Sequence, residues 1–255
     1  MKFKLESNEL NHSTHDCIVV GVHEDNKLTS SAQKLDKAGR HYISKLLESG
    51  ELDGKPGKTL MLHHVPELKA KRVLLTGCGK NTAMTIRDYR SMILATVRAL
   101  NTANVKNALL CLTELEVTDH DLPSRIRQLV EMSSDALYEF TEYKSKKSPK
   151  PALQQISLHL IEKTDIKSCE TALKQGIAIA AGVEFTKNLA NQPSNVATPS
   201  WLADKAKELA KDYPSIKIKI LEEKDMKKLG MGAFLSVTKG SDQDAKMVCL
   251  EYTGT

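Results

Sequence analysis

The chain contains the uninterrupted apolar stretch Cys17-Ile18-Val19-Val20-Gly21-Val22, which has the length of a β-strand. Such runs are typical of strands that helices cover on both faces, because a strand with one solvated face alternates apolar and polar residues. Further segments with strand character are residues 59–63, 73–76, 108–112 and 156–161. The sequence therefore predicts a largely parallel or mixed sheet.

Three amphipathic segments lie between these strands, and their apolar residues recur at steps of three and four. Their apolar faces consist of Leu35, Ala38, Tyr42, Ile43 and Leu46 in the first, Ile86, Tyr89, Ile93, Val97 and Leu100 in the second, and Leu122, Ile126, Leu129, Val130, Ser133 and Leu137 in the third. Strands that alternate with helices predict an α/β domain of three layers. We assign it to residues 1–163 and interpret the basic segment 144–151 as a solvated loop before its last strand.

A helix rich in small residues is expected at about 167–188, where glycines and alanines would let another backbone approach closely. The Asn- and Pro-rich stretch Lys187-Asn188-Leu189-Ala190-Asn191-Gln192-Pro193-Ser194-Asn195 then forms a hinge, since Pro193 stops helix propagation. Thr198 and Pro199 suit the start of the next helix. We therefore expect a linker helix in 164–190 and a third part, 191–255, that is too short to close a domain of its own.

Within that third part the sequence predicts a helix to about residue 212, a half-exposed strand at 216–221, a short helix at 222–229 closed by Gly230, and a strand at 247–252. We expect its apolar residues to lack partners and to leave apolar surface exposed. These residues are Leu202, Ile216, Ile218, Ile220 and Val248.

Composition is that of an ordinary globular chain of 255 residues, 40% of them hydrophobic. The five cysteines are odd in number and mostly lie in apolar runs, which indicates buried free thiols in a reducing compartment. No segment has the length of an apolar membrane span, and the N-terminus lacks a signal-peptide pattern, so a cytoplasmic protein is expected. The net charge of +5 is too mild to indicate polyanion binding.

Candidate metal ligands are few. His12, His15 and Asp16 lie close in sequence, and His63 and His64 are adjacent. Neighbouring side chains on a strand point to opposite faces, so the histidine pair is not expected to chelate one ion. The sequence predicts no metal site at either place.

One loop, Thr76-Gly77-Cys78-Gly79-Lys80, follows a strand and has glycines that could let backbone amides approach a phosphate. It lacks the spacing of a P-loop, and a tight turn leaving the sheet is the favoured interpretation. No Gly-x-Ser-x-Gly elbow occurs, and the cysteines have no evident histidine partner. The segment Lys239-Gly240-Ser241-Asp242 is expected to be a polar turn.

The hinge also carries a resemblance. Several short motifs follow one another here: Asn188, Asn191, Pro193 and Asn195, then Thr198-Pro199, Leu229-Gly230-Met231-Gly232, Lys239-Gly240-Ser241 and Leu250-Glu251-Tyr252. Their order and spacing resemble those of the leucyl aminopeptidase family, the bacterial cytosol aminopeptidases of peptidase family M17. The resemblance implies a macro-domain-like fold for the N-terminal domain, with Gly77-Cys78-Gly79-Lys80 similar to the family's glycine-lysine turn. It also implies that residues 191–255 begin an α/β zinc-peptidase-like catalytic domain.

Members of this family form cytoplasmic hexamers and remove N-terminal residues, preferably leucine, from peptides. Two divalent cations, zinc or manganese, activate a water and polarise the scissile carbonyl. The family's ligands lie in a Gly-Lys-Gly…Phe-Asp-Ser-Gly-Gly segment and an Asn-Thr-Asp-Ala-Glu-Gly-Arg segment, and neither occurs here. We therefore assign no catalytic, cofactor-binding or metal-binding residue and expect this chain, taken as a truncated part of such an enzyme, to be inactive.

Two alternative functions concern the N-terminal domain. Macro-like folds can hold ADP-ribose or another nucleotide, and some bacterial members of the family bind DNA. The basic loop from Lys144 to Lys150 is compatible with DNA binding, but aromatic residues make up only 4% of the chain and no base-reading motif occurs.

Overall fold

The computed structural model describes residues 1–146, 149–161 and 165–254. The chain separates into two compact units, Met1–Glu184 and Phe185–Thr255. The division falls inside α5 (Ile166–Ala190), the helix expected as a linker. Among the described residues, no helix combines the length and the apolar character that crossing a membrane requires.

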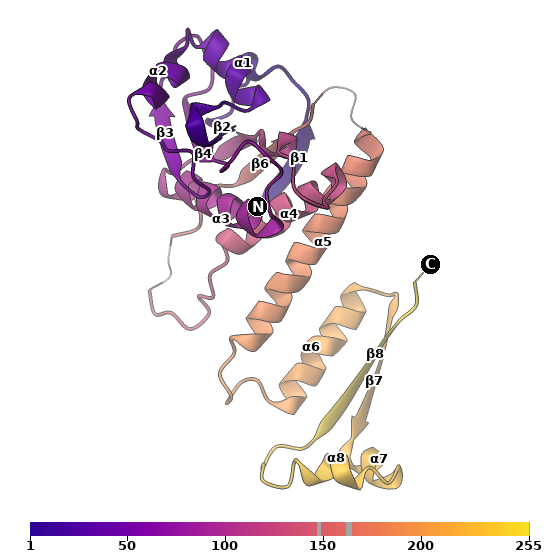
Figure 1. The fold of residues 1–255 in the computed structure, drawn as a ribbon. Coiled ribbons are helices and arrows are strands. Elements are labelled where there is room, and N and C mark those ends of the chain that lie inside the picture. Colours follow the sequence, from indigo (N-terminus) through magenta and orange to yellow (C-terminus); the bar gives the residue numbers. More distant parts are fainter. Residues whose placement is uncertain (147–148, 162–164, 255) are drawn as a thin grey trace. The chain divides into compact units, whose positions relative to one another are not determined.

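The first unit is built on a six-stranded sheet with the order β1-β6-β5-β2-β4-β3 (Figure 1). Its strands are β1 (Lys2–Glu6), β2 (Cys17–Val22), β3 (Thr59–His63), β4 (Arg72–Gly77), β5 (Asn107–Leu110) and β6 (Gln155–His159). All neighbours are parallel except the antiparallel pair β3 and β4. The five predicted strands and the mainly parallel sheet are confirmed, whereas the edge strand β1 was not predicted.

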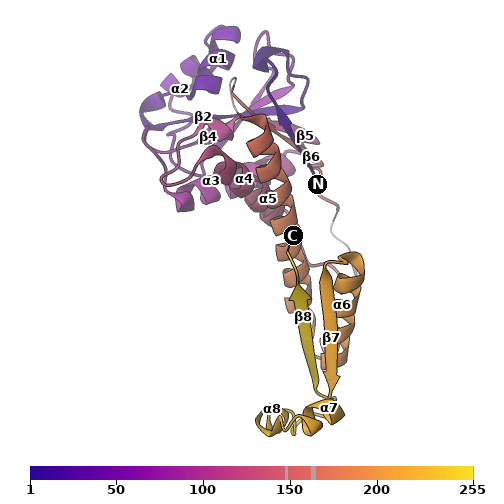
Figure 2. The ribbon, with the colours of Figure 1, turned by 90° about the vertical axis from the view of Figure 1, so that its right-hand side faces the viewer.

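Helices cover both faces of this sheet, which confirms the three layers (Figures 1 and 2). Ile18 and Val20 pack with α1 (Ser30–Ala38) and α2 (Tyr42–Glu48) on one face. Cys17 and Val19 pack on the other face with α3 (Ile86–Thr102), α4 (Leu122–Ala136) and the first turns of α5. Successive residues of β2 thus enter two different cores, which is why none of its six residues is polar.

The structure corrects the first predicted helix, which is two helices rather than one. Arg40 and His41 adopt left-handed backbone conformations, with φ of 56° and 60°, between α1 and α2. Asp36, only 4% exposed, accepts hydrogen bonds from the Ser44 backbone amide at 2.9 Å and from the Ser44 hydroxyl at 2.5 Å. The prediction of a single helix was wrong because the apolar spacing continues across the break. The Asp36 side chain, which binds the first turn of α2 at Ser44, does not alter that spacing.

The close approach expected along the helix 167–188 occurs at Gly176 of α5. A Cβ atom at this position would lie 3.1 Å from Val130 Cβ and 3.2 Å from Arg127 Cα, both on α4. By contrast, a Cβ at Gly182 would meet nothing within 4 Å. Gly176 therefore lets α4 and α5 pack closely, while Gly182 has no such role.

The second unit contains α6 (Pro199–Asp212), β7 (Ile216–Glu222), α7 (Glu223–Lys228), α8 (Gly232–Ser236) and β8 (Lys246–Tyr252). The predicted helices and strands are confirmed, and α8 was not predicted. Thr198 caps α6 by accepting a hydrogen bond from the Trp201 amide at 3.3 Å. β7 and β8 form an antiparallel ladder in which Ile218 lies opposite Leu250.

The expected exposure of apolar residues in this unit holds only in part. Leu202 is exposed, at 42%. Ile216, Ile218, Ile220 and Val248 are instead half-buried, because they share one face of the β7–β8 ladder and α6 packs against both strands. These four residues are therefore covered in part, and less of their apolar surface is open than expected.

Candidate functional site

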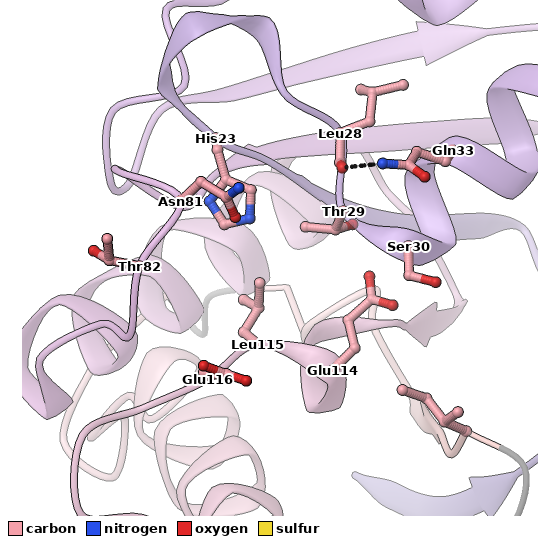
Figure 3. A pocket seen from close by; sticks show the side chains of 11 residues that line it. His23, Leu28, Thr29, Ser30, Gln33, Asn81, Thr82, Glu114, Leu115 and Glu116 are labelled. Atoms are coloured by element: carbon pink, nitrogen blue, oxygen red, sulfur yellow. Dashed lines mark hydrogen bonds between the residues drawn. The ribbon is translucent and has the colours of Figure 1, made fainter.

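A cavity of about 440 Å³ lies at the carboxyl ends of the parallel strands of the first unit (Figure 3). Its walls come from the loops that follow β2, β4, β5 and β6. After β2 the chain runs to β4 on one side of β2, and it later returns to β5 on the other side. Sheets of this kind bind ligands where the strand order reverses, outside the carboxyl ends of the strands. Topology alone therefore makes this cavity a candidate binding site.

Two carboxylates line the cavity, and they have different surroundings. Glu114 follows β5 and accepts hydrogen bonds from the Ser31 amide, at 3.2 and 3.0 Å from its two oxygens, and from the Ser31 hydroxyl at 2.8 Å. Ser31 lies in the first turn of α1, so Glu114 satisfies a free amide of the helix and complements its dipole. Glu116 is exposed, and its carboxylate makes no hydrogen bond or ion pair within the part of the chain that the structure describes.

His23 and Asn81 also line the cavity, from the loops that follow β2 and β4 (Figure 3). The His23 Nδ1 atom is shielded from solvent and has no hydrogen-bond partner among the described residues. An unpaired buried polar atom of this kind is uncommon in folded proteins. Three aliphatic side chains, those of Leu28, Leu115 and Ile161, line the same cavity. The cavity thus combines acceptor groups with an apolar surface.

The glycine-lysine loop after β4 forms a tight turn whose amides are used within the protein. The Gly77 amide donates to the Lys58 carbonyl, the Cys78 amide to the Val22 carbonyl and the Gly79 amide to the Gly54 carbonyl, each at 2.8 Å. A Cβ at Gly77 would lie 2.0 Å from the Lys55 carbonyl oxygen, so only glycine fits there. The three amides cannot cradle a phosphate in this conformation.

The histidines singled out in the sequence have structural partners or lie exposed. His15 contacts the Ser13 hydroxyl through Nδ1 at 2.8 Å and the Ser157 hydroxyl through Nε2 at 3.1 Å. Asp16 instead accepts a hydrogen bond from Lys71 Nζ at 2.9 Å, which holds the pKa of its carboxyl below the usual range despite partial burial. His12 faces Glu9, with Nε2 and the carboxylate 3.6 Å apart. His12, His15 and Asp16 therefore point to different partners.

Other candidate residues also fall outside the cavity. His63 and His64 are both exposed at the end of β3. Residues 238–241 form a turn in which the Ser241 amide donates to the Thr238 carbonyl at 3.0 Å. Across 1–146, 149–161 and 165–254, the structure brings no three His, Cys, Asp or Glu side chains into a group that could hold a metal ion.

The cysteines of the first unit are buried, as predicted from their apolar neighbours. Cys17, Cys78, Cys111 and Cys169 are at most 1% exposed, and Cys249 in the second unit is half-buried. Burial raises the pKa of the Cys17 and Cys78 thiols to about 12. These thiols are therefore poor nucleophiles at neutral pH.

None of the cavity residues was a candidate from the sequence. Glu114 and Glu116 come soon after the strand expected at 108–112, and His23 directly follows the stretch Cys17–Val22. Their position just beyond strand ends was the available signal, since the carboxyl ends of parallel strands share one edge of the sheet. In the basic loop, Lys144 pairs with Glu139, while Lys147 and Ser148 lie outside the described residues.

Both parts of the chain match domain models of one protein family. Residues 19–147 match the N-terminal domain of the cytosol aminopeptidase family, and residues 184–255 match its catalytic domain. Probable cytosol aminopeptidases of Methylobacillus flagellatus and Nitrosococcus oceani are 40% and 41% identical to it over 253 and 255 residues. These alignments cover 99% and 100% of the chain and 51% of each relative, so the chain spans about half the length of the curated relatives it matches.

Solved structures show the same fold. A variant of tomato leucine aminopeptidase superposes with a TM-score of 0.81 at 22% identity, covering 99% of this chain and 51% of that one. The bottromycin maturation enzyme BotP, in complex with Mn, superposes with a TM-score of 0.72 at 21% identity. The superposition covers 94% of this chain and 45% of the BotP chain. The fold, the two matched domains and the sequence identity agree with the resemblance carried by the hinge, and the chain belongs to the cytosol aminopeptidase family, as an N-terminal portion of such a protein.

Proposed function

We propose that the whole protein is a metal-dependent aminopeptidase that removes N-terminal residues, preferably leucine, from peptides. The match of residues 19–147 and 184–255 to the two domains of one peptidase family supports this function. When bound, two divalent cations, zinc or manganese, would activate water and polarise the scissile carbonyl. The manganese in the BotP complex supports a divalent metal in a protein of this fold.

The metal ligands and catalytic residues lie, in this proposal, outside these 255 residues. The described residues do not fit such a metal pair, because they bring no three His, Cys, Asp or Glu side chains together. What the chain contributes is the N-terminal domain, residues 1–163, a linker helix, 164–190, and the first elements of the catalytic domain, 191–255. The whole protein would act as a homo-hexamer in the cytoplasm.

Leucine p-nitroanilide hydrolysis in the presence of Mn²⁺ or Zn²⁺ tests both parts of the proposal. The 255-residue chain should show no metal-dependent turnover, whereas a protein extended from the same gene to the length of its relatives should turn over at rates of roughly 1–1,000 per second. Turnover by the short chain would refute the placement of the ligands. A folded, metal-loaded extended protein without turnover would refute the aminopeptidase function itself.

A further inference from the structure

Among the described residues, the cavity at the carboxyl edge of the first sheet presents no group that would hold a phosphate. The α1 helix begins beside it, and helix N-termini commonly bind anions. Here the Glu114 carboxylate already occupies that position, at 2.8–3.2 Å from the Ser31 amide and hydroxyl. A phosphate at the same place would have to displace this carboxylate and would be repelled by it.

The other residues that line the cavity also disfavour the binding of an anion. Among the described residues that line the cavity none is lysine or arginine, and two are glutamates. The amides of Gly77, Cys78 and Gly79 donate to carbonyls of the same chain. Electrostatics therefore argue against ADP-ribose or another nucleotide as the ligand, although the cavity lies where α/β sheets bind such molecules.

The same groups suit a cation that carries hydrogen-bond donors. The Glu116 carboxylate makes no hydrogen bond or ion pair within the part of the chain that the structure describes. Asn81 and Thr82 lie on the neighbouring loop, and each adds a side-chain oxygen that can accept. An ammonium group has three donors and no acceptor, so it matches this set.

The apolar wall adds a requirement on the rest of the ligand. Leu28, Leu115 and Ile161 also line the cavity; Leu115 is 4% exposed and Ile161 is 50% exposed. A volume of about 440 Å³ is within the range of small-molecule sites. We propose that this cavity binds a small primary ammonium ion with a short aliphatic body, such as an amino-acid amide or an alkylamine.

Titration of the ¹⁵N-labelled 255-residue chain, followed by backbone amide shifts at low ionic strength, tests this proposal. The probes are 3-methylbutylamine, L-leucinamide, 3-methylbutanol, ADP-ribose and inorganic phosphate. Both amines should shift the amides of Asn81, Thr82 and Glu116 with dissociation constants of about 1–10 mM, as expected for one partly exposed charge pair and a small apolar contact. Binding should weaken with added NaCl, since exposed charges are screened.

The Glu116→Gln substitution removes one charge without removing a hydrogen bond that holds the fold. It should weaken binding of the amines about fivefold. Glu51→Gln, the same change at an exposed glutamate outside the cavity, is the matched control and should leave binding unchanged.

The comparison between the two amines identifies the source of the ligand. Tighter binding of L-leucinamide would favour amino-acid derivatives, whereas equal binding would favour simple amines. Three results would overturn the proposal: no shift at the cavity amides with 20 mM amine, equal binding of 3-methylbutanol and 3-methylbutylamine, or ADP-ribose shifts centred on the cavity. The outcome is independent of the aminopeptidase proposal, because the short chain alone is titrated.

Discussion

Replacing Glu114 by glutamine should destabilise the first unit by about 2 kcal/mol. The wild-type carboxylate accepts three hydrogen bonds from Ser31, which is only 3% exposed, at the start of α1. Glutamine is similar in size and keeps one acceptor oxygen. Without the charge, each remaining hydrogen bond contributes about 1 kcal/mol less to the free energy of unfolding. The favourable interaction with the helix dipole, about 0.3–1 kcal/mol, is lost as well.

Glu116→Gln is the internal control, since this side chain lies two residues away, is exposed and should change stability by less than about 0.5 kcal/mol. The only tryptophan, Trp201, lies in the second unit, so its fluorescence does not report on the first. Urea unfolding should instead be followed by far-UV circular dichroism and by labelling of the buried Cys111 thiol.

In a thermal scan, Glu114→Gln should lower the Tm of this unit by about 4–8 °C, given about 2–4 °C per kcal/mol for domains of this size. The reasoning is refuted if the Glu114 and Glu116 variants unfold at the same urea concentration and the same temperature. A Ser31→Ala variant completes a double-mutant cycle. The losses in unfolding free energy caused by Ser31→Ala and by Glu114→Gln should not add, because both variants remove the same contact.

Three further predictions concern other parts of the protein. Gly182→Ala should stabilise α5 by up to about 1 kcal/mol, whereas Gly176→Ala should cost about 1–2 kcal/mol because the new methyl group meets α4; urea midpoints compare the pair. Burial raises the pKa of the Asp36 carboxyl, but hydrogen bonds from Ser44 outweigh burial, and the net pKa is lowered. Asp36 therefore stabilises the fold fully above its unfolded pKa of about 3.9, and this stabilisation is lost as the pH falls through the folded pKa. Accordingly Asp36→Asn should destabilise at pH 7 and converge with wild type near pH 2 in acid-unfolding curves. Brief iodoacetamide treatment at pH 8 should alkylate Cys249 first, because the other four cysteines are buried, and mass spectrometry checks this. Equal labelling of Cys249 and the four buried cysteines would contradict the prediction.

The layers of the first unit could be predicted because their signal is local. Strands buried on both faces must be apolar at every position, and the stretch Cys17–Val22 satisfies this directly. β1 was missed because it is short, as edge strands often are, and has only two apolar residues, Phe3 and Leu5, to signal a strand. The break between α1 and α2 was missed because Asp36 and Ser44 create it through a side-chain cap, while the apolar spacing continues across it.

The family could also be recognised from the sequence, since the hinge residues from Asn188 to Thr198 keep a fixed order and spacing. The alternatives for the N-terminal domain could not be separated in this way. Gly77 was compatible with a phosphate loop until its amide was found bonded to the Lys58 carbonyl. Whether a backbone amide is free depends on which distant carbonyl lies beside it, and sequence does not contain that information.

The sequence by itself determined the α/β class, the strands and helices that carry it, and the family, because each depends on residue type and spacing along a short segment. Only the tertiary structure decided the chemistry of the cavity. His23, Asn81 and Glu116 come from three loops that meet because β2, β4 and β5 are parallel neighbours. The parallel pairing brings their carboxyl ends to one edge, and there Glu114 caps α1, so the edge that commonly binds anions presents carboxylates instead.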